Sequence, residues 1–313
     1  MSETVKIATR VSYGKALAAL GHEHPDIVVL DADLATATKT DIFRSEFPDR
    51  HIDCGIAEQN MIDTAAGLST MGLVPFASTF AMFSAGRAFE MIRNTIGYAH
   101  LNVKIGATHG GISVGADGAS HQCCEDFALM RTIPGMTVMC PADDIEAQQM
   151  VRAAYEYSGP VYMRFCRAAS EVIHDENCHF VIGKGEVLRE GTDGAIIAVG
   201  LMVPEAVHAH EALLEKGICT RVINMPVIKP LDEELVLKAA EECGFVVTCE
   251  EHSVIGGLGE AVCSLVCENR PVPVTRIGIR DRFGTSGPAG DLMKEYGLTS
   301  GDIVQAVLEK LGK

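Results

Sequence analysis

Short apolar runs alternate with longer stretches of helical periodicity along the first half of the chain. The runs are typical of buried strands, because each holds a few consecutive apolar residues and ends in a polar loop. They cover residues 27–33, 73–80, 103–108, 136–140 and 161–166. Helices are expected between them, at about 13–22, 41–46, 85–99, 125–131 and 141–157. This alternation predicts parallel strands covered by helices, and therefore an α/β fold.

The stretch from His51 to Gly67 changes its periodicity in the middle. Apolar residues at 52, 54 and 56 alternate as in a short strand, whereas those at 61, 65 and 68 recur at helical spacing. Glu58 is therefore expected in the first turn of a helix, at the carboxyl end of a strand, where ligand crevices open in parallel sheets. Taken alone, Glu58 is more simply a carboxylate that complements the helix dipole.

A polar, irregular segment separates this half from a second one with the same alternation. Strands are expected at about 184–188, 195–199, 220–224, 245–250 and 272–278, and helices at 203–216, 233–242, 286–296 and 299–311. We predict a first domain over 1–168, a linker over 169–183 and a second domain over 184–313. The predicted fold class is α/β, with two parallel-sheet domains and helices on both faces of each sheet.

Two strand ends carry candidate chemistry that also has a structural explanation. Phe80 and Phe83 follow the strand at 73–80; such a pair usually belongs to a core, but it also suits an aromatic wall for a flat ring. Asp33 follows the strand at 27–33, where it either caps the next helix or faces a ligand.

The loop from His109 to His121 is the clearest candidate for a functional loop. Its thirteen residues include four glycines, two histidines and Asp117, and it follows a predicted strand. Histidine can donate, accept or carry charge near neutral pH, so this loop favours a site over packing. The spacing matches no common zinc pattern, and no metal ligand is assigned. Arg164 and Arg167 end the last strand, either as surface ion pairs or as a clamp for phosphate or carboxylate.

The glycine turn at 256–259 before a predicted helix resembles half of a dinucleotide-binding fingerprint. It lacks the complete GxGxxG spacing and an acidic residue at the right distance. A tight turn with close helix packing is therefore the favoured interpretation.

Net charge and cysteine content indicate which partners and which cellular compartment to expect. A formal charge of −16 argues against nucleic acid or an anionic membrane as a partner. The eleven cysteines form no CxxC pair, and no secretory leader or membrane-spanning run is found. We expect a cytoplasmic protein with reduced thiols; for Cys123 and Cys124, a role in activity and simple packing both stay open.

Taken in order, several motifs resemble the carboxyl-terminal half of a transketolase over nearly the whole chain. They are Asp31-Ala-Asp-Leu34, Gly55-Ile-Ala-Glu-Gln-Asn-Met61, Ser78-Thr-Phe80, Thr108-His109, Gly115-Ala-Asp-Gly-Ala-Ser-His-Gln122, Met139-Cys-Pro-Ala-Asp143, Gly256-Gly-Leu-Gly259 and Phe283-Gly-Thr-Ser-Gly287. The resemblance implies a pyrimidine-binding domain followed by the transketolase C-terminal domain. The family's diphosphate-binding domain carries a GDG motif, which this sequence lacks. We therefore expect one subunit of a split transketolase, with Mg²⁺ ligated mainly by a separate diphosphate-binding subunit.

The resemblance also implies how the chain holds the cofactor. Glu58 matches the glutamate that hydrogen-bonds the pyrimidine N1′ of thiamine diphosphate, and it is the first catalytic residue. Phe80 and Phe83 match the aromatic wall for the pyrimidine ring, and Asp33 is placed among the cofactor-binding residues. A tyrosine usual in relatives is here Gly86, so that part of the wall is absent or supplied by Arg87.

The substrate residues follow from the same resemblance. His109 and His121 match residues for substrate oxygens and proton transfer, and Asp117 matches a residue for a sugar hydroxyl. Arg167 matches an arginine that binds the substrate phosphate. A serine that helps to hold phosphate in relatives is here Ala37, with Thr36 or Thr38 as substitutes.

The implied activity is transfer of a two-carbon ketol unit from a ketose, or its phosphate, to an aldose. We expect an α2β2 heterotetramer with cofactor sites between chains. Deoxyxylulose-phosphate synthases and oxoacid dehydrogenase β subunits share the fold; the Thr-His pair at 108–109 together with the loop at 117–121 favours transketolase. A non-catalytic scaffold subunit is the alternative from another class.

Overall fold

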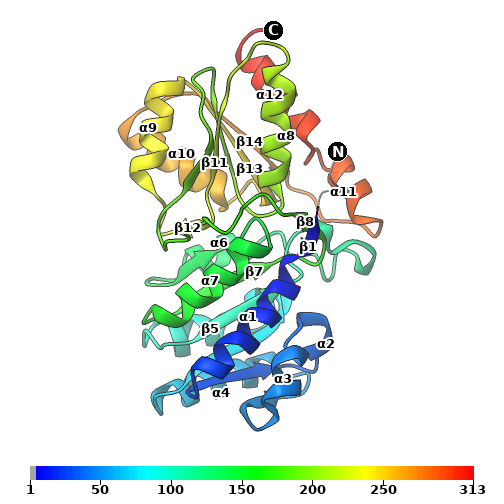
Figure 1. Cartoon of the computed structure of the whole chain (residues 1–313), viewed down its shortest axis with the longest axis vertical. Coiled ribbons are helices and arrows are strands. Elements are labelled where there is room, and N and C mark those ends of the chain that lie inside the picture. Colours follow the sequence, from blue (N-terminus) through cyan, green and yellow to red (C-terminus); the bar gives the residue numbers. More distant parts are fainter. Residues whose placement is uncertain (1–4) are drawn as a thin grey trace.

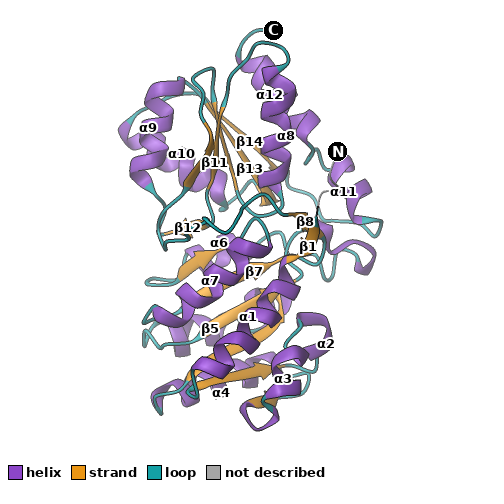
Figure 2. Ribbon diagram, viewed as in Figure 1, coloured by secondary structure: helices purple, strands orange, loops and turns teal. Residues whose placement is uncertain are grey.

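Two sheets organise the chain, one in each half of the molecule (Figure 1). They are seen in a computed structural model that describes residues 5–313. The first sheet occupies the lower half of the view and the second the upper half, with helices on both faces of each (Figure 2). This arrangement confirms the predicted α/β class.

The first sheet has seven strands, and its interior pairs are all parallel. Their order is β12 (Val227–Lys229), β6 (Thr137–Met139), β7 (Val161–Phe165), β5 (Lys104–Thr108), β4 (Val74–Phe80), β2 (Ile27–Asp31) and β3 (His51–Asp53). Only β12, at one edge, pairs antiparallel. Because parallel strands end at the same edge, residues after β2, β3, β4, β5 and β7 meet there.

Helices cover both faces of this sheet with separate apolar clusters. They are α1 (Thr9–Glu23), α2 (Ala35–Thr38), α3 (Asp41–Glu46), α4 (Glu58–Thr70), α5 (Phe89–Met91), α6 (Asp126–Arg131) and α7 (Asp144–Glu156), with the 3₁₀ segments η1 (Pro48–Arg50) and η4 (Ile112–Asp117). On one face, Leu17 of α1 and Met150 of α7 pack against Phe76 of β4. On the other face, Met61 of α4 and Phe127 of α6 belong to a second cluster.

The segment predicted as one helix over 85–99 has a different form. It consists of two π-helical segments, η2 (Met82–Arg87) and η3 (Ile92–Gly97), on either side of α5. The apolar pattern of the sequence did not distinguish these wider turns from an ordinary α-helix. π-helical turns are rare and occur frequently at functional sites, and η2 carries Phe83 and Arg87.

The second sheet has five strands, four of them parallel. Their order is β14 (Val274–Ile279), β13 (Val246–Ser253), β10 (Ala195–Ala198), β11 (Arg221–Asn224) and β9 (Glu186–Arg189), which pairs antiparallel with β11. The helices are α8 (Met202–Leu214), α9 (Glu233–Cys243), α10 (Leu258–Asn269), α11 (Ala289–Glu295) and α12 (Ser300–Lys310). Helices α9 and α10 lie on one side of the sheet, and α8 and α12 on the other (Figure 1).

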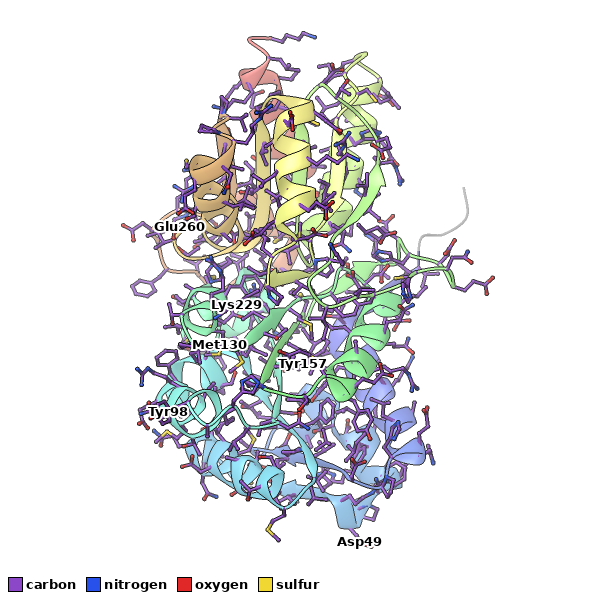
Figure 3. All side chains as sticks on the ribbon, turned by 90° about the vertical axis from the view of Figure 1, so that its left-hand side faces the viewer. Asp49, Tyr98, Met130, Tyr157, Lys229 and Glu260 are labelled. Carbon is purple, nitrogen blue, oxygen red and sulfur yellow. The ribbon has the colours of Figure 1, made fainter. Side chains whose placement is uncertain are left out.

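The two halves share strands and core. β12 follows β11 in the chain but joins the first sheet, and Lys229 of β12 donates to the carbonyls of Arg131 and Ile133. Figure 3 shows Lys229 between the two halves, above Met130 of α6. β8 (Ala169–Glu171) lies in the predicted linker and pairs with β1 (Lys6–Ala8). One apolar cluster runs from Met61 into the second sheet. The proposed domain limits at 168 and 184 therefore stay a prediction.

A buried histidine ties the linker to both halves. The main-chain amide and Nδ1 of His174 donate to Oδ2 of Asp143, at 2.8 and 2.9 Å, and Nε2 lies 3.0 Å from Oε2 of Glu186. Asp143 also caps α7 through Glu146 N. Burial alone would lower the pKa of His174, but the hydrogen bonds to Asp143 and Glu186 and the charge of Glu146 raise the pKa to about 10.

Replacing His174 by Gln is expected to change the pH dependence of stability. A group whose folded pKa is raised from 6.5 to about 10 contributes stability that is complete below pH 6.5 and is lost as the pH rises towards 10. The difference in melting temperature between wild type and His174→Gln should therefore be largest near pH 6 and shrink towards pH 10. His179→Gln, at an exposed histidine, is the control. A difference that is constant or grows with pH would contradict the assignment.

Candidate active site

Glu58 is the first residue of α4, and its side chain is 1% exposed. The chain reaches it from β3 through a turn at Gly55, whose φ of +68° lies in the left-handed region. Both carboxylate oxygens lie 2.8 Å from Nη1 of Arg87. The strand-to-helix junction predicted from the sequence therefore holds a buried carboxylate, and its partner comes from η2.

Two phenylalanines and two histidines form an aromatic cluster at the ends of β4 and β5. The rings of Phe80 and Phe83 stack with centroids 5.5 Å apart, and Phe80 stacks on His109 at 3.8 Å. His121 meets the ring of Phe83 edge-on at 5.4 Å. Phe80 is 7% exposed and Phe83 half-buried. Phe80 is therefore buried, as a core residue would be, and it also stacks on a candidate site residue; its role as an aromatic wall stays a prediction.

His109 is held as a neutral side chain. Its φ of +59° lies in the left-handed region, its Nδ1 lies 2.9 Å from Oγ1 of Thr108, and the residue is 2% exposed. Burial lowers the pKa of His109 to about 3, and the positive charges of Arg10 and Arg167 act in the same direction. His109 can therefore donate or accept a hydrogen bond at neutral pH, but it does not carry charge there.

Two arginines place positive charge beside His109. Arg167, which follows β7, donates to the carbonyl of Val114 and lies 3.3 Å from Oδ2 of Asp117. Arg10, in the first turn of α1, donates to the carbonyl of Ala37 at 2.6 Å. Arg10 was missed by the sequence analysis, because an arginine in a helix looks like an ordinary surface residue until the fold places it.

Asp33 lies at the same edge of the sheet but not in the aromatic cluster. Its main-chain amide donates to Oδ1 of Asp53 at 3.1 Å, and its φ is +61°. It lines a separate cleft of about 400 Å³ with Thr36, Ala37 and Arg44 among its neighbours. None of its described contacts reaches Glu58 or the phenylalanines.

The second half of the molecule supports the loop at 109–121. Gln122, 4% exposed, donates from Nε2 to the carbonyls of Ile112 and Gly115 and to that of Thr285, the last at 2.9 Å. A cleft of about 590 Å³ opens between residues 113–116 and 286–289, with Arg167 on its wall. The motif at 283–287 thus shapes the same site as the glycine-rich loop.

Arg164 corrects one of the sequence interpretations. It is 2% exposed, lies 3.5 Å from Asp126 and donates to the carbonyls of Cys123 and Glu251. A Cβ on Gly110 would come within 1.9 Å of its Nε. Arg164 is therefore a buried support beneath the loop, and neither a surface ion pair nor a ligand clamp.

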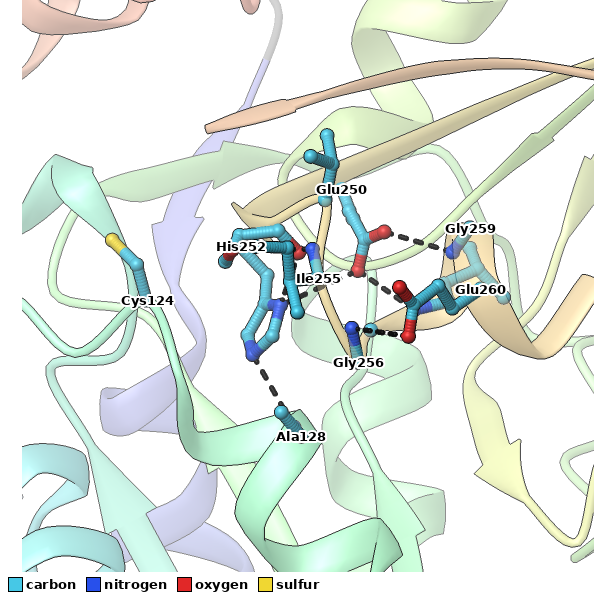
Figure 4. A network of polar contacts seen from close by, with 12 residues as sticks. Cys124, Ala128, Glu250, His252, Ile255, Gly256, Gly259 and Glu260 are labelled. Carbon is cyan, nitrogen blue, oxygen red and sulfur yellow. Dashed lines mark hydrogen bonds and ion pairs between the residues drawn. The ribbon is translucent and has the colours of Figure 1, made fainter. Parts of the chain in front are cut away.

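The glycine turn at 256–259 is occupied by the protein's own carboxylate. Glu250 of β13 accepts from the amides of Leu258 and Gly259 at the start of α10, at 2.7 and 2.8 Å (Figure 4). A Cβ on Gly257 would approach Oε2 of Glu250 to 1.9 Å. The carboxylate fills the position that a phosphate takes in a dinucleotide site. The favoured interpretation, a tight turn with close packing, is correct.

The cysteines supply no reactive thiol to the site. All eleven cysteines lie within the described residues and none forms a disulfide. Cys123 and Cys124 are 0% and 8% exposed, and burial raises the pKa of both thiols. Buried thiols of this kind are inert packing groups. Across residues 5–313, no three His, Cys, Asp or Glu side chains are grouped to hold a metal ion, and no helix is long and apolar enough to cross a bilayer.

Two family models match nearly the whole chain. Residues 5–171 match the transketolase pyrimidine-binding domain, and residues 183–303 match the transketolase C-terminal domain. The chain belongs to the transketolase family. The resemblance inferred from the motifs is therefore confirmed, and the chain is a transketolase-type enzyme subunit of a family that depends on thiamine diphosphate.

Among known proteins, similar chains include a split-gene protein, a C-terminal section and a subunit of transketolases. A solved structure described as a split-gene transketolase in an inactive beta4 tetramer is 51% identical, with a TM-score of 0.91, over 97% of this chain and 98% of that one. A Methanocaldococcus jannaschii protein named as a transketolase C-terminal section is 50% identical over 97% of this chain and 96% of its own length. A 6-deoxy-6-sulfo-D-fructose transketolase subunit of Clostridium sp. is 42% identical over 96% of this chain and 93% of its own length.

Proposed function

We propose that this transketolase subunit forms half of an active site that a separate diphosphate-binding subunit completes. The assembled enzyme transfers a two-carbon ketol unit from a ketose to an aldose. One observation carries this proposal: a buried carboxylate, Glu58, is paired with Arg87, whose guanidinium lies over Phe83 of the aromatic cluster that includes Phe80 and His109.

The residues present fit the pyrimidine ring of thiamine diphosphate. A buried carboxylate accepts a hydrogen bond from a ring N–H, and Phe83 offers a half-buried aromatic face on which a flat ring stacks. When bound, the cofactor supplies the carbon nucleophile of the reaction. Glu58 holds the pyrimidine N1′ and shares its proton, which is the catalytic role proposed for it. Phe80 stacks on Phe83 and so supports the ring that would contact the pyrimidine. Asp33 is the remaining residue proposed for the cofactor, and it lines a separate cleft where its main-chain amide donates to Asp53.

The two histidines divide the substrate chemistry by their surroundings. His109 is buried and neutral, so it donates or accepts a hydrogen bond at a substrate oxygen. His121 is half-buried at the edge of Phe83, where it is open to substrate and suited to proton transfer. Asp117 is exposed beside Arg167 and accepts from a sugar hydroxyl.

Positive charge favours an anionic sugar as substrate. Arg10 and Arg167 flank His109 in a chain of net charge −16, so this local charge opposes the background. A guanidinium binds phosphate with charge-assisted hydrogen bonds. Arg10 donates to the carbonyl of Ala37, the position where relatives carry a serine that helps to hold phosphate, so Arg10 lies at that end of the site. The Clostridium relative is named for a sulfosugar, which is also an anionic sugar.

The descriptions of the relatives support a separate partner. The solved relative is described as a split-gene transketolase and the Clostridium relative as a transketolase subunit, and this chain covers 98% and 93% of their respective lengths. We propose that the partner subunit ligates Mg²⁺ and the diphosphate in an α2β2 heterotetramer located in the cytoplasm. Self-association of this chain alone, as in the beta4 tetramer of the solved relative, would then be the inactive form. The substrates are sugar phosphates, without nucleic acid or membrane as partners.

Replacing Glu58 by Gln tests the proposed function. In the assembly with the diphosphate-binding subunit, Glu58→Gln should lower ketol transfer by roughly 10²- to 10⁴-fold, because an amide cannot take up the proton that a carboxylate shares. Glu90→Gln, at an exposed glutamate on α5, should leave the rate unchanged. A wild-type chain that gains no thiamine-dependent activity from its partner would support the scaffold alternative instead.

Replacing Arg10 or Arg167 by Ala tests the binding of the anionic group. Each loss should raise KM for a ketose phosphate by about 10- to 100-fold, since a hydrogen bond to a charged group contributes about 1.5–3 kcal/mol. The corresponding ketose without phosphate should be affected much less. Arg93→Ala, on η3, is the matched control. Equal losses for both sugars would show that the arginines position the loop and do not bind phosphate.

A further inference from the structure

The carboxylate of Glu58 is already engaged in the chain alone. Nη1 of Arg87 lies 2.8 Å from each oxygen, and the guanidinium carbon lies 4.5 Å from the centroid of Phe83. Within residues 5–313, Arg87 is the only cation paired with Glu58. One side chain therefore covers both the carboxylate and a face of the aromatic ring next to it.

These two contacts coincide with those assigned to the cofactor's ring under the proposed function, on which this inference rests. A pyrimidine that hydrogen-bonds Glu58 and stacks on Phe83 needs the space that the guanidinium fills. Two planar groups cannot occupy the same face of a ring, since packed atoms approach to no less than about 3.5 Å. Arg87 therefore has to move before the ring can bind.

The structure shows which of the two residues can move. Glu58 is fixed, because it is 1% exposed and begins a helix of thirteen residues. Arg87 is 46% exposed and is the last residue of η2, directly after Gly86. The arginine side chain can swing into solvent while the helix stays in place.

We propose that Arg87 is a displaceable cap on Glu58 that competes with the cofactor's pyrimidine ring. In the free subunit the cap keeps a buried carboxylate paired, because removing one partner of a buried ion pair leaves an uncompensated charge. On assembly, the ring takes over the carboxylate and the face of Phe83, and Arg87 turns outward. Cofactor affinity is therefore lowered by the need to displace the cap.

Substitution of the free subunit tests the ion pair first. Arg87→Met keeps an unbranched apolar side chain over Phe83 and removes the charge. It should lower the melting temperature of the subunit alone, and the double variant Arg87→Met/Glu58→Gln should recover most of the loss. Arg93→Met, on η3, is the control and should have little effect. Independent, additive effects of the two substitutions would overturn the proposed pairing.

Calorimetry of the assembled enzyme then tests the competition. Thiamine diphosphate with Mg²⁺ should bind Arg87→Met about tenfold more tightly than wild type, in the presence of the diphosphate-binding subunit. Arg87→Lys, with a shorter reach, should lie between them and serves if the Met variant does not fold. Unchanged or weaker binding would overturn the cap, because Arg87 would then be neutral or a cofactor ligand.

Glu58→Gln in the same titration separates this inference from the proposed function. If Glu58→Gln weakens binding and Arg87→Met does not tighten it, the cap is wrong while the function stands. If Glu58→Gln has no effect on binding in the Arg87→Met background, where no cap remains, the assignment of Glu58 to the pyrimidine is wrong, and the cap falls with it.

Discussion

A buried carboxylate needs a partner, and the position of Glu58 makes this requirement the centre of the site. The side chain is 1% exposed at the start of α4, where the helix dipole favours a negative charge. In the free subunit the partner is Arg87, and in the assembled enzyme we assign that place to the cofactor's ring. The surroundings follow from the parallel sheet, which brings the ends of β3, β4, β5 and β7 to the same edge.

The second half of the molecule supports the site structurally, and we assign no reactive group of the site to it. Gln122 links the glycine-rich loop to Thr285, and Arg164 links β7 to the carbonyl of Glu251. Gly110 and Gly111 leave room for Arg164 and Glu251, which explains two of the loop's glycines by close approach. The buried side chains of Arg164 and Glu251 therefore support the loop that carries His109 and Asp117. The geometry of this loop depends on contact between the two halves.

The sequence predicted those features that follow from periodicity and from the common end of parallel strands. The α/β class, the junction at Glu58 and the functional loop at His109 are of this kind. The sequence did not reveal Arg10, because a helix residue acquires its role only when the fold brings it next to Ala37 and His109. The sequence predicted one helix over 85–99, so it missed both the π-helical turns and the start of η2 at Met82. β12 crosses into the first sheet through long-range pairing that no local pattern encodes.

The most direct test of the account is a calorimetric titration with thiamine diphosphate and Mg²⁺. It is made first on this subunit alone and then on its mixture with the diphosphate-binding subunit. The account predicts no measurable binding to the subunit alone and saturable binding to the mixture, since each chain supplies one half of the site. Tight binding to the subunit alone, or none to the mixture, would contradict a shared site between the chains.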